Sequence, residues 1–318
     1  MFVYSIPMRN RFRGITVREG VLVEGPRGWG EFCAFLDYSD VECVPWLACA
    51  TEAAEHGWPA PVRDRVPVNC TVPVVSPERA HEIVTASGCA TAKVKVADPG
   101  AALADDVERV AAVRDALGPS GAVRVDANAA WDVDTAVRAI RELDRAAGGL
   151  EYVEQPCPSI EELAAVRRRV DVRIAADESI RRAEDPLRVA VAGAADLAVI
   201  KVAPLGGVRR ALEVAEAAGL PCVVSSAVET SVGMAAGLAL AGALPELDFA
   251  CGLGTLSLLD GDVVDDSLRP VDGWLPVPAQ PPVPVRREEF AADPATTRRW
   301  EERVARVLAE SGTRPHWL

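Results

Sequence analysis

Hydrophobic and polar positions follow two alternating patterns along the chain from residue 66 onward. Short runs rich in β-branched residues are separated by Ala- and Leu-rich stretches with helical periodicity. The runs predict eight strands, at 66–72, 90–97, 122–128, 150–156, 172–179, 197–203, 221–227 and 249–255. The stretches between them predict seven helices, for example Pro77–Ser87, Asp132–Ala147 and Gly207–Ala218.

This alternation predicts an α/β fold made of strand–helix–strand units with right-handed crossovers. Asp132 suits the N-cap of its helix and Gly219 suits a C-terminal cap. An open, doubly wound sheet is the alternative, but the nearly even spacing of eight strands favours a closed barrel. The first strand is also not followed by a G-x-G-x-x-G motif. We therefore predict a modified TIM barrel, (β/α)7β, over residues 66–255.

The two flanks of the barrel have a different pattern. Residues 14–32 alternate like a β-meander, and residues 40–57 have helical character. Residues 276–285 are Pro-rich and extended, and a charged amphipathic helix is expected near Thr297–Ser311. Because neither flank is large enough to hold a core alone, we expect residues 1–65 and 256–318 to pack together as an α+β capping domain.

Composition and charge exclude several classes of protein. The formal net charge of −13 in 318 residues, without a basic cluster, argues against a nucleic-acid partner. The most apolar run, Val232–Leu244, would reach only about 20 Å as a helix, so it predicts a buried helix and no membrane partner. The N-terminal stretch does not resemble a signal peptide, and the eight cysteines lack zinc-like spacing, so a cytoplasmic protein with reduced thiols is expected.

Polar residues end six successive predicted strands, where barrels of this type carry their catalytic groups, and in five of the six they are charged. They are Lys93, Lys95, Asp126, Asn128, Glu154, Asp177, Glu178, Lys201, Ser225 and Ser226. An edge strand with a solvated face would explain the two lysines of TAKVKVAD (91–98) alone, and a salt bridge would explain any single charge. Five successive strands ending in charge are harder to explain as packing, because unpaired buried charges are costly.

The order of these residues predicts a site. Asp126, Glu154 and Asp177 follow three adjacent strands, and three carboxylates without nearby His or Cys suit Mg²⁺. Lys95 and Lys201 lie four strands apart in a ring of eight, so they are expected to face each other across the pocket. A metal flanked by two amines suits removal of a proton next to a carboxylate.

Lys93 and Lys95 should project to one face of their strand, since side chains at i and i+2 do so. Burial and a neighbouring cation both disfavour the charged form of an ammonium. We therefore expect Lys93 to help Lys95 act as a base and to contact the substrate carboxylate.

Nearly the whole chain resembles the enolase superfamily, in particular its muconate-lactonizing-enzyme-like subgroup. The motifs that carry the resemblance are K-V-K (93–95), D-A-N-A-A-W (126–131), E-Q-P (154–156), D-E-S (177–179), I-K-V (200–202) and S-S-A-V-E-T (225–230). Within the subgroup, G-W-G-E-F (28–32), S-S-A-V-E-T-S-V-G (225–233) and G-L-G-T (252–255) look most like the o-succinylbenzoate synthase family.

The resemblance implies a role for each candidate residue. Asp126, Glu154 and Asp177 would bind Mg²⁺; Lys95 would abstract the α-proton of 2-succinyl-6-hydroxy-2,4-cyclohexadiene-1-carboxylate and return it to the departing hydroxyl; and Lys201 would stay cationic and stabilise the enediolate. Substrate contacts would come from Lys93, Ser225, Ser226, Gly252 and Gly254, while Asn128 and Glu178 would orient the other groups. This is the chemistry of a carbon–oxygen lyase of menaquinone biosynthesis.

Other functions fit parts of the pattern. An N-acylamino acid racemase, or another epimerase or cycloisomerase of the subgroup, would use Lys95 and Lys201 as opposed acid and base. Lys201 could instead form a Schiff base in an aldolase-like barrel, and a barrel that only binds a ligand is a third alternative. The first cap loop, Pro7–Thr16, is expected to be short, and the sequence leaves the oligomeric state open, with a monomer possible.

Overall fold

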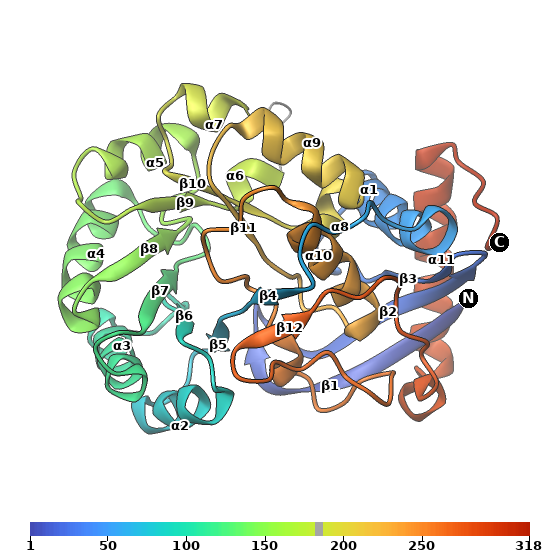
Figure 1. The fold of residues 1–318 in the computed structure, drawn as a ribbon, viewed down its shortest axis with the longest axis horizontal. Coiled ribbons are helices and arrows are strands. Elements are labelled where there is room, and N and C mark those ends of the chain that lie inside the picture. Colours follow the sequence, from blue (N-terminus) through green and yellow to red (C-terminus); the bar gives the residue numbers. More distant parts are fainter. Residues whose placement is uncertain (182–186) are drawn as a thin grey trace.

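A curled sheet of seven parallel strands lies at the centre of the larger part of the molecule (Figure 1). The computed structural model describes residues 1–181 and 187–318. The strand order is β11-β10-β9-β8-β7-β6-β5, so each strand lies beside its neighbours in sequence. The strands are β5 (Cys70–Val72), β6 (Thr91–Lys95), β7 (Ala122–Asp126), β8 (Leu150–Glu154), β9 (Ile174–Ala176), β10 (Leu197–Ile200) and β11 (Cys222–Val224).

The segment predicted as the eighth strand joins the two edges of this sheet. Cys251 forms a parallel bridge with Val68 just before β5, and Gly252 forms one with Ser225 just after β11. The amide of Gly252 donates a hydrogen bond to the carbonyl of Val224 at 2.7 Å. A Cβ on Gly252 would lie 2.5 Å from Ser225 Oγ, so this close approach requires glycine. The barrel is therefore closed, as predicted, although its last element is a short bridge.

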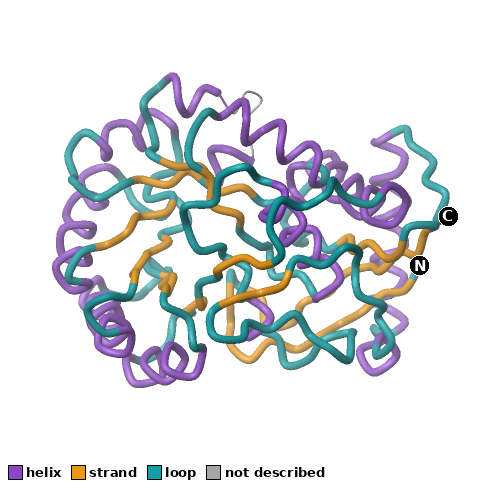
Figure 2. The backbone as a smooth tube through the Cα atoms, in the orientation of Figure 1, coloured by secondary structure: helices purple, strands orange, loops and turns teal. Residues whose placement is uncertain are grey.

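Helices surround the sheet on its outer face (Figure 2). Asp132 caps α4 by accepting a hydrogen bond from the amide of Thr135 at 2.7 Å, and Gly219 ends α9 with a φ of 61°. Both predicted caps are confirmed. The helices are α2 (Pro77–Ser87), α3 (Leu103–Leu117), α4 (Val133–Ala147), α5 (Ile160–Arg167), α6 (Glu178–Arg181), α7 (Leu187–Val191), α8 (Val202–Leu205), α9 (Val208–Ala218) and α10 (Ser231–Ala243).

A capping domain built from both flanks packs beside the barrel, and both termini lie at its end of the molecule (Figure 1). Its antiparallel sheet has the order β1-β2-β3. Its core includes Trp300, which packs edge-on against Phe32 with 5.8 Å between ring centroids. The elements are β1 (Phe2–Phe12), β2 (Ile15–Gly25), β3 (Gly28–Phe32), α1 (Asp40–Thr51), a π-helix (Glu52–His56), 3₁₀ helices Thr255–Leu258 and Arg287–Phe290, and α11 (Pro294–Ser311).

A small two-stranded sheet, β4 (Arg65–Pro67) with β12 (Trp274–Pro276), lies where the flanks leave the barrel. The α+β cap is confirmed, and the boundaries at 65/66 and 255/256 stay a prediction. The predicted buried helix at 232–244 is α10, whose residues are almost all buried. No helix in the described part of the chain is long and apolar enough to cross a membrane.

The stretch expected as a short cap loop, 7–16, is instead mostly strand. β1 and β2 pair until Phe12 meets Ile15, which leaves only Arg13 and Gly14 in the turn. Both turn residues have positive φ, 49° and 80°. Two-residue hairpin turns of this hand match the twist of the strands but favour Gly, Asn or Asp. Arg13 is therefore an unusual residue for its position.

Candidate active site

The two lysines of the KVK motif lie on an interior strand of the barrel. β6 pairs with β5 on one side and with β7 on the other, so it is no edge strand. Lys93 is 6% exposed, and Lys95 is paired in register with Asp126 of β7. Asp126 in turn is paired with Glu154 of β8. Parallel pairing at these positions thus places the charged ends of three successive strands at one level of the barrel.

Each of the three candidate acids accepts an ion pair from a different lysine. Lys95 Nζ binds Asp126 Oδ2, and Lys201 Nζ binds Asp177 Oδ2. Lys93 Nζ donates to Glu154 Oε2 at 2.8 Å and lies 3.6 Å from Asp126 Oδ2. Lys93 is therefore paired with an acid, which differs from its expected role as a cation acting mainly on Lys95. Its contact with the substrate stays a prediction.

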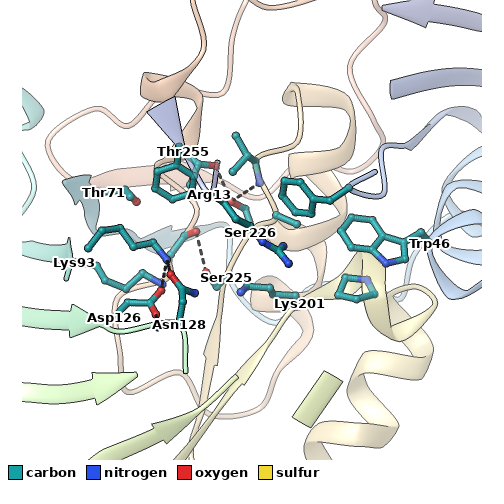
Figure 3. A pocket seen from close by; sticks show the side chains of 17 residues that line it. Arg13, Trp46, Thr71, Lys93, Asp126, Asn128, Lys201, Ser225, Ser226 and Thr255 are labelled. Carbon is teal, nitrogen blue, oxygen red and sulfur yellow. Dashed lines mark hydrogen bonds and ion pairs between the residues drawn. The ribbon is translucent and has the colours of Figure 1, made fainter. Parts of the chain in front are cut away.

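One cavity is lined by all three lysines of the strand ends. Lys95 lies at the end of β6 and Lys201 directly after β10, and both line this cavity. Their roles as opposed catalytic groups stay a prediction. Figure 3 shows Lys93, Asp126 and Asn128 on one side and Lys201 on another. The cavity is lined by Phe12, Arg13, Phe35, Trp46, Thr71, Lys93, Lys95, Asp126, Asn128, Lys201, Pro204, Ser225, Ser226, Ala227, Val228, Gly252 and Thr255.

Burial and neighbouring charges shift the pKa values of this group in opposite directions. Burial, with the negative charge of Asp126, raises the pKa of Glu154 to about 7. Burial alone would also raise the pKa of Asp126, but the ammonium groups of Lys95 and Lys93 hold it well below its usual range. Burial would lower the pKa of Lys93, but Glu154 and Asp126 raise it above its usual value. Charge is thus stable on Asp126 and Lys93 and costly on Glu154.

The acids suit a hard divalent cation. Asp126, Glu154 and Asp177 are at most 1% exposed, and Glu154 Oε1 has no hydrogen-bond partner among the described residues. A buried carboxylate oxygen without a partner is costly unless a cation completes its surroundings. In the described parts of the chain no three acidic, His or Cys side chains form a ready metal-ligand group. Each acid instead binds a lysine.

The other predicted site residues differ in their distance from the cavity. Ser225, Ser226 and Gly252 line it, whereas Gly254 does not. Ser226 Oγ lies 2.6 Å from Thr255 Oγ1. Asn128 lines the cavity and accepts a hydrogen bond from Lys95 Nζ at 2.6 Å, which supports its predicted orienting role. Glu178 lines the outer mouth of the barrel.

Sequence reasoning did not assign a role to Gln155, the central residue of the E-Q-P motif. Its side chain is fully buried, and Oε1 accepts hydrogen bonds from the amides of Asp177 at 2.9 Å and Ser179 at 3.2 Å. Its Nε2 donates to the carbonyl of Cys157 at 2.9 Å. Gln155 thus fixes the backbone that carries Asp177. A polar residue directly after Glu154 at a buried strand end was the signal that could have found it.

Aromatic residues of the cap were also missed, because no local pattern links them to the barrel. Phe12 lies at the end of β1, and its ring centroid is 5.2 Å from Lys95 Nζ. Phe35 and Trp46 line the same cavity. The cap therefore supplies an apolar wall opposite the charged strand ends.

A second group of buried charges lies where the cap meets the barrel. Arg18, Glu31 and Glu229 are 2%, 4% and 6% exposed. Arg18 Nε donates to the carbonyl of Val228 at 2.9 Å, and Glu31 Oε1 accepts from the Tyr4 hydroxyl at 2.7 Å. Burial raises the pKa of Glu229 to about 7. We call Arg18, Glu31 and Glu229 the junction cluster.

Comparison with known protein families identifies the family to which this chain belongs. A family model described as "Enolase C-terminal domain-like" matches residues 76–282, and one described as "Enolase N-terminal domain-like" matches residues 3–54. The chain belongs to the enolase superfamily. Within the superfamily it is 65% identical to a protein of Thermobifida fusca (strain YX) named o-succinylbenzoate synthase, over 96% of this chain and 95% of that protein. A protein of the same name from Mycolicibacterium smegmatis is 56% identical over 96% of this chain and 94% of its own length.

Solved structures of the superfamily share the fold at low identity. Muconate lactonizing enzyme from Pseudomonas putida aligns with a TM-score of 0.74 at 22% identity, covering 92% of this chain and 98% of that chain. The L-Ala-D/L-Glu epimerase from Bacillus subtilis aligns with a TM-score of 0.75 at 24% identity, covering 88% and 95%. These likenesses confirm the barrel with its capping domain.

Proposed function

We propose that this enzyme dehydrates 2-succinyl-6-hydroxy-2,4-cyclohexadiene-1-carboxylate to o-succinylbenzoate, as a carbon–oxygen lyase acting in cytoplasmic menaquinone biosynthesis. The observation that carries the proposal is the shared cavity of Lys95 and Lys201, with a buried acid bound to each. The high identity to proteins named o-succinylbenzoate synthase supports this substrate. The substrate is a small carboxylate, and the cavity offers it the ammonium groups of Lys95 and Lys201 and the hydroxyls of Ser225 and Ser226.

We propose that Asp126, Glu154 and Asp177 hold Mg²⁺. The support is the all-oxygen donor set, its burial, and Glu154 Oε1, which has no hydrogen-bond partner in the part of the chain that the structure describes. A bound Mg²⁺ would stabilise the negative charge that develops on the substrate carboxylate when the α-proton leaves. The ammonium groups of Lys95 and Lys93 keep Asp126 ionised before the cation binds, whereas a bound cation would offset the cost of charge on the buried Glu154.

Lys95 takes the α-proton of the substrate, and the same Nζ returns a proton to the departing hydroxyl, so that water leaves from the same face. Asn128 orients Lys95 through the hydrogen bond to its Nζ. Lys201 stays protonated beside Asp177 and contributes a fixed positive charge on another wall. Phe12, Phe35 and Trp46 exclude water from this chemistry.

Racemisation of N-acylamino acids is a second candidate, because two lysines sharing one cavity could remove a proton on one face and deliver it on the other. A Schiff base on Lys201 is the remaining alternative, and it would need no metal. The three buried acids, with a Glu154 Oε1 that has no hydrogen-bond partner among the described residues, favour a cation-dependent reaction instead.

The test is a dehydration assay with the cyclohexadiene substrate in Mg²⁺ and in EDTA, with deuterium exchange at the α-carbon of N-succinylamino acids measured in parallel. We expect dehydration that EDTA abolishes and Mg²⁺ restores. Exchange without dehydration would favour the racemase, and activity that survives EDTA and is trapped by borohydride would favour the Schiff-base enzyme.

A further inference from the structure

We propose that Arg13, at the tip of the cap hairpin, binds a second carboxylate of the substrate, remote from the carbon that loses its proton. This deepens the proposed function and rests on it, since o-succinylbenzoate and its precursor both carry a carboxylate at the end of the succinyl chain. Arg13 would thereby select dicarboxylates over otherwise identical monocarboxylates.

Arg13 lies on the cap side of the cavity that contains both lysines. It directly follows Phe12, whose ring packs against Lys95, so the hairpin tip reaches the region of the proposed base. In Figure 3, Arg13, Ser226 and Thr255 lie together, apart from Lys93, Asp126 and Asn128. A ligand that meets Lys95 at one end therefore has Arg13 available at another.

The charges around the cavity leave Arg13 as the group best able to bind an anion. Lys93, Lys95 and Lys201 are each paired with a buried acid. The nearest acid to Arg13 is Asp37, at 3.7 Å and 64% exposed, and surface pairs of this kind contribute little. Its guanidinium donates no hydrogen bond to any residue in the described ranges. A carboxylate fits such a fork, because two parallel N–H donors can bind both of its oxygens.

The position of the guanidinium is fixed by aromatic packing. Arg13 Cζ lies 4.2 Å from the centroid of Phe35, and Arg18 Cζ lies 4.4 Å from the same ring. Arg303 of α11 holds the backbone beneath, because its Nη2 donates to the carbonyl of Phe35 at 2.7 Å. A stacked guanidinium keeps its edge free for hydrogen bonds, so Arg13 is held ready to bind a ligand.

The hairpin conformation also points to a function for this side chain. Arg13 has a φ of 49°, in the left-handed region that disfavours residues with a Cβ. Glycine would suit the position better. An arginine at a position that glycine would occupy with less strain points to a role for its side chain.

The experiment compares two ligands that differ only at the remote end. Dissociation constants for o-succinylbenzoate and for 2-butyrylbenzoate, which has a methyl group in place of the terminal carboxylate, are measured by calorimetry in Mg²⁺ buffer. We expect the wild type to prefer o-succinylbenzoate about tenfold, the value of one charge-assisted bidentate contact. In Arg13→Met this preference should vanish through weaker binding of o-succinylbenzoate, with 2-butyrylbenzoate unchanged.

Two further variants separate binding from structure. Arg11→Met is the matched control, because Arg11 lines the outer mouth but not the inner cavity, and it should keep the preference. Arg13→Gly suits the positive φ, so it should keep or raise the melting temperature and still lose the preference. An unchanged preference in Arg13→Met, or an equal loss of affinity for both ligands, would overturn the proposal.

Failure of this proposal can be told apart from failure of the proposed function. If the wild type dehydrates the substrate but its preference for o-succinylbenzoate does not depend on Arg13, only the proposed carboxylate contact is contradicted. A preference that depends on Arg13 in an enzyme that cannot dehydrate the cyclohexadiene contradicts only the assigned reaction.

Discussion

Two buried glutamates in this protein have the same raised pKa of about 7 but lie in regions with different tasks. Glu154 ends β8 among the charged strand ends of the barrel, and Glu229 belongs to the junction cluster between barrel and cap. In both, burial is the largest cause of the shift. A perturbed pKa alone therefore does not distinguish a site of chemistry from a structural contact.

The partners of the two regions do distinguish them. In the junction cluster, charges meet fixed backbone groups: Glu229 Oε2 accepts from the Ala227 amide at 2.8 Å, and Glu31 Oε2 accepts from the Gly233 amide at 2.9 Å. At the strand ends, charges meet the flexible side chains Lys93, Lys95 and Lys201, and Glu154 Oε1 has no hydrogen-bond partner among the described residues. Side-chain partners that can move, and a carboxylate oxygen without a hydrogen-bond partner among the described residues, indicate binding and proton transfer. Carboxylates held by backbone amides indicate a structural contact between barrel and cap.

Lys95→Ala should have the largest effect on this comparison. Loss of the proton-transferring amine should reduce kcat on the order of 10⁴-fold. Folding should persist, because Asp126 keeps Lys93 at 3.6 Å as a second cation. The measurement is steady-state dehydration, with circular dichroism as the check on folding. Activity at a tenth of the wild type or more would show that another group is the base.

Glu154→Gln tests the strand-end region directly. One of three acids is lost and Lys93 loses its closest partner, so kcat/KM should fall on the order of 10³-fold and the Mg²⁺ concentration for half-maximal activity should rise. Glu229→Gln is the matched control, being the same change at the same pKa in the other region, and it should stay within about twofold of the wild type. Equal losses in the two variants would remove the distinction drawn between the regions.

Lys201→Arg separates a fixed charge from a proton carrier. Arginine keeps the positive charge beside Asp177 but cannot release a proton at neutral pH. Dehydration should fall only about a hundredfold, as expected of a misplaced charge, while α-proton exchange on N-succinylamino acids should disappear. Both activities are followed on one preparation. If they fall by the same factor, Lys201 has the same task in each reaction.

Much of this could be predicted from sequence where the signal is local. Strand ends, helix caps such as Asp132 and the order of Asp126, Glu154 and Asp177 all follow from patterns within a few residues. Parallel register between neighbouring strands then carries Asp126 and Glu154 to one level, and Asp177 follows two residues after the partner of Glu154 on the next strand. The barrel and the charged residues that line the cavity from its strand ends could be predicted for this reason.

Contacts between distant segments were not predictable in the same way. The packing of Phe12 on Lys95 and the pairing of Lys93 with Glu154 depend on side-chain directions across separate elements. The segment 7–16 was predicted as a loop although it is mostly strand, because its solvent-facing side chains are largely polar. The eighth strand was overestimated in length, since only Cys251 and Gly252 bridge the sheet edges.

Glu229→Gln should also change how stability depends on pH, without a large effect on activity. The pKa of Glu229 is about 7 in the folded protein against 4.5 for an ordinary glutamate. Below pH 4.5 Glu229 is protonated in both the folded and the unfolded protein. Between pH 4.5 and 7 only the unfolded chain releases this proton, so the free energy of unfolding falls as pH rises. Above pH 7 this loss of stability is complete. Arg18 and Glu31 face this carboxyl from the cap, and Arg18 offsets part of the loss. Urea unfolding at pH 5 and pH 8 should therefore show wild type losing about 2 kcal/mol more than the amide variant between the two values. All other titratable groups are shared by the two proteins, so their contributions cancel in this difference. Equal losses of stability in the two proteins would mean that Glu229 is ionised in the folded state. The junction cluster would then hold a buried negative charge as the strand ends do.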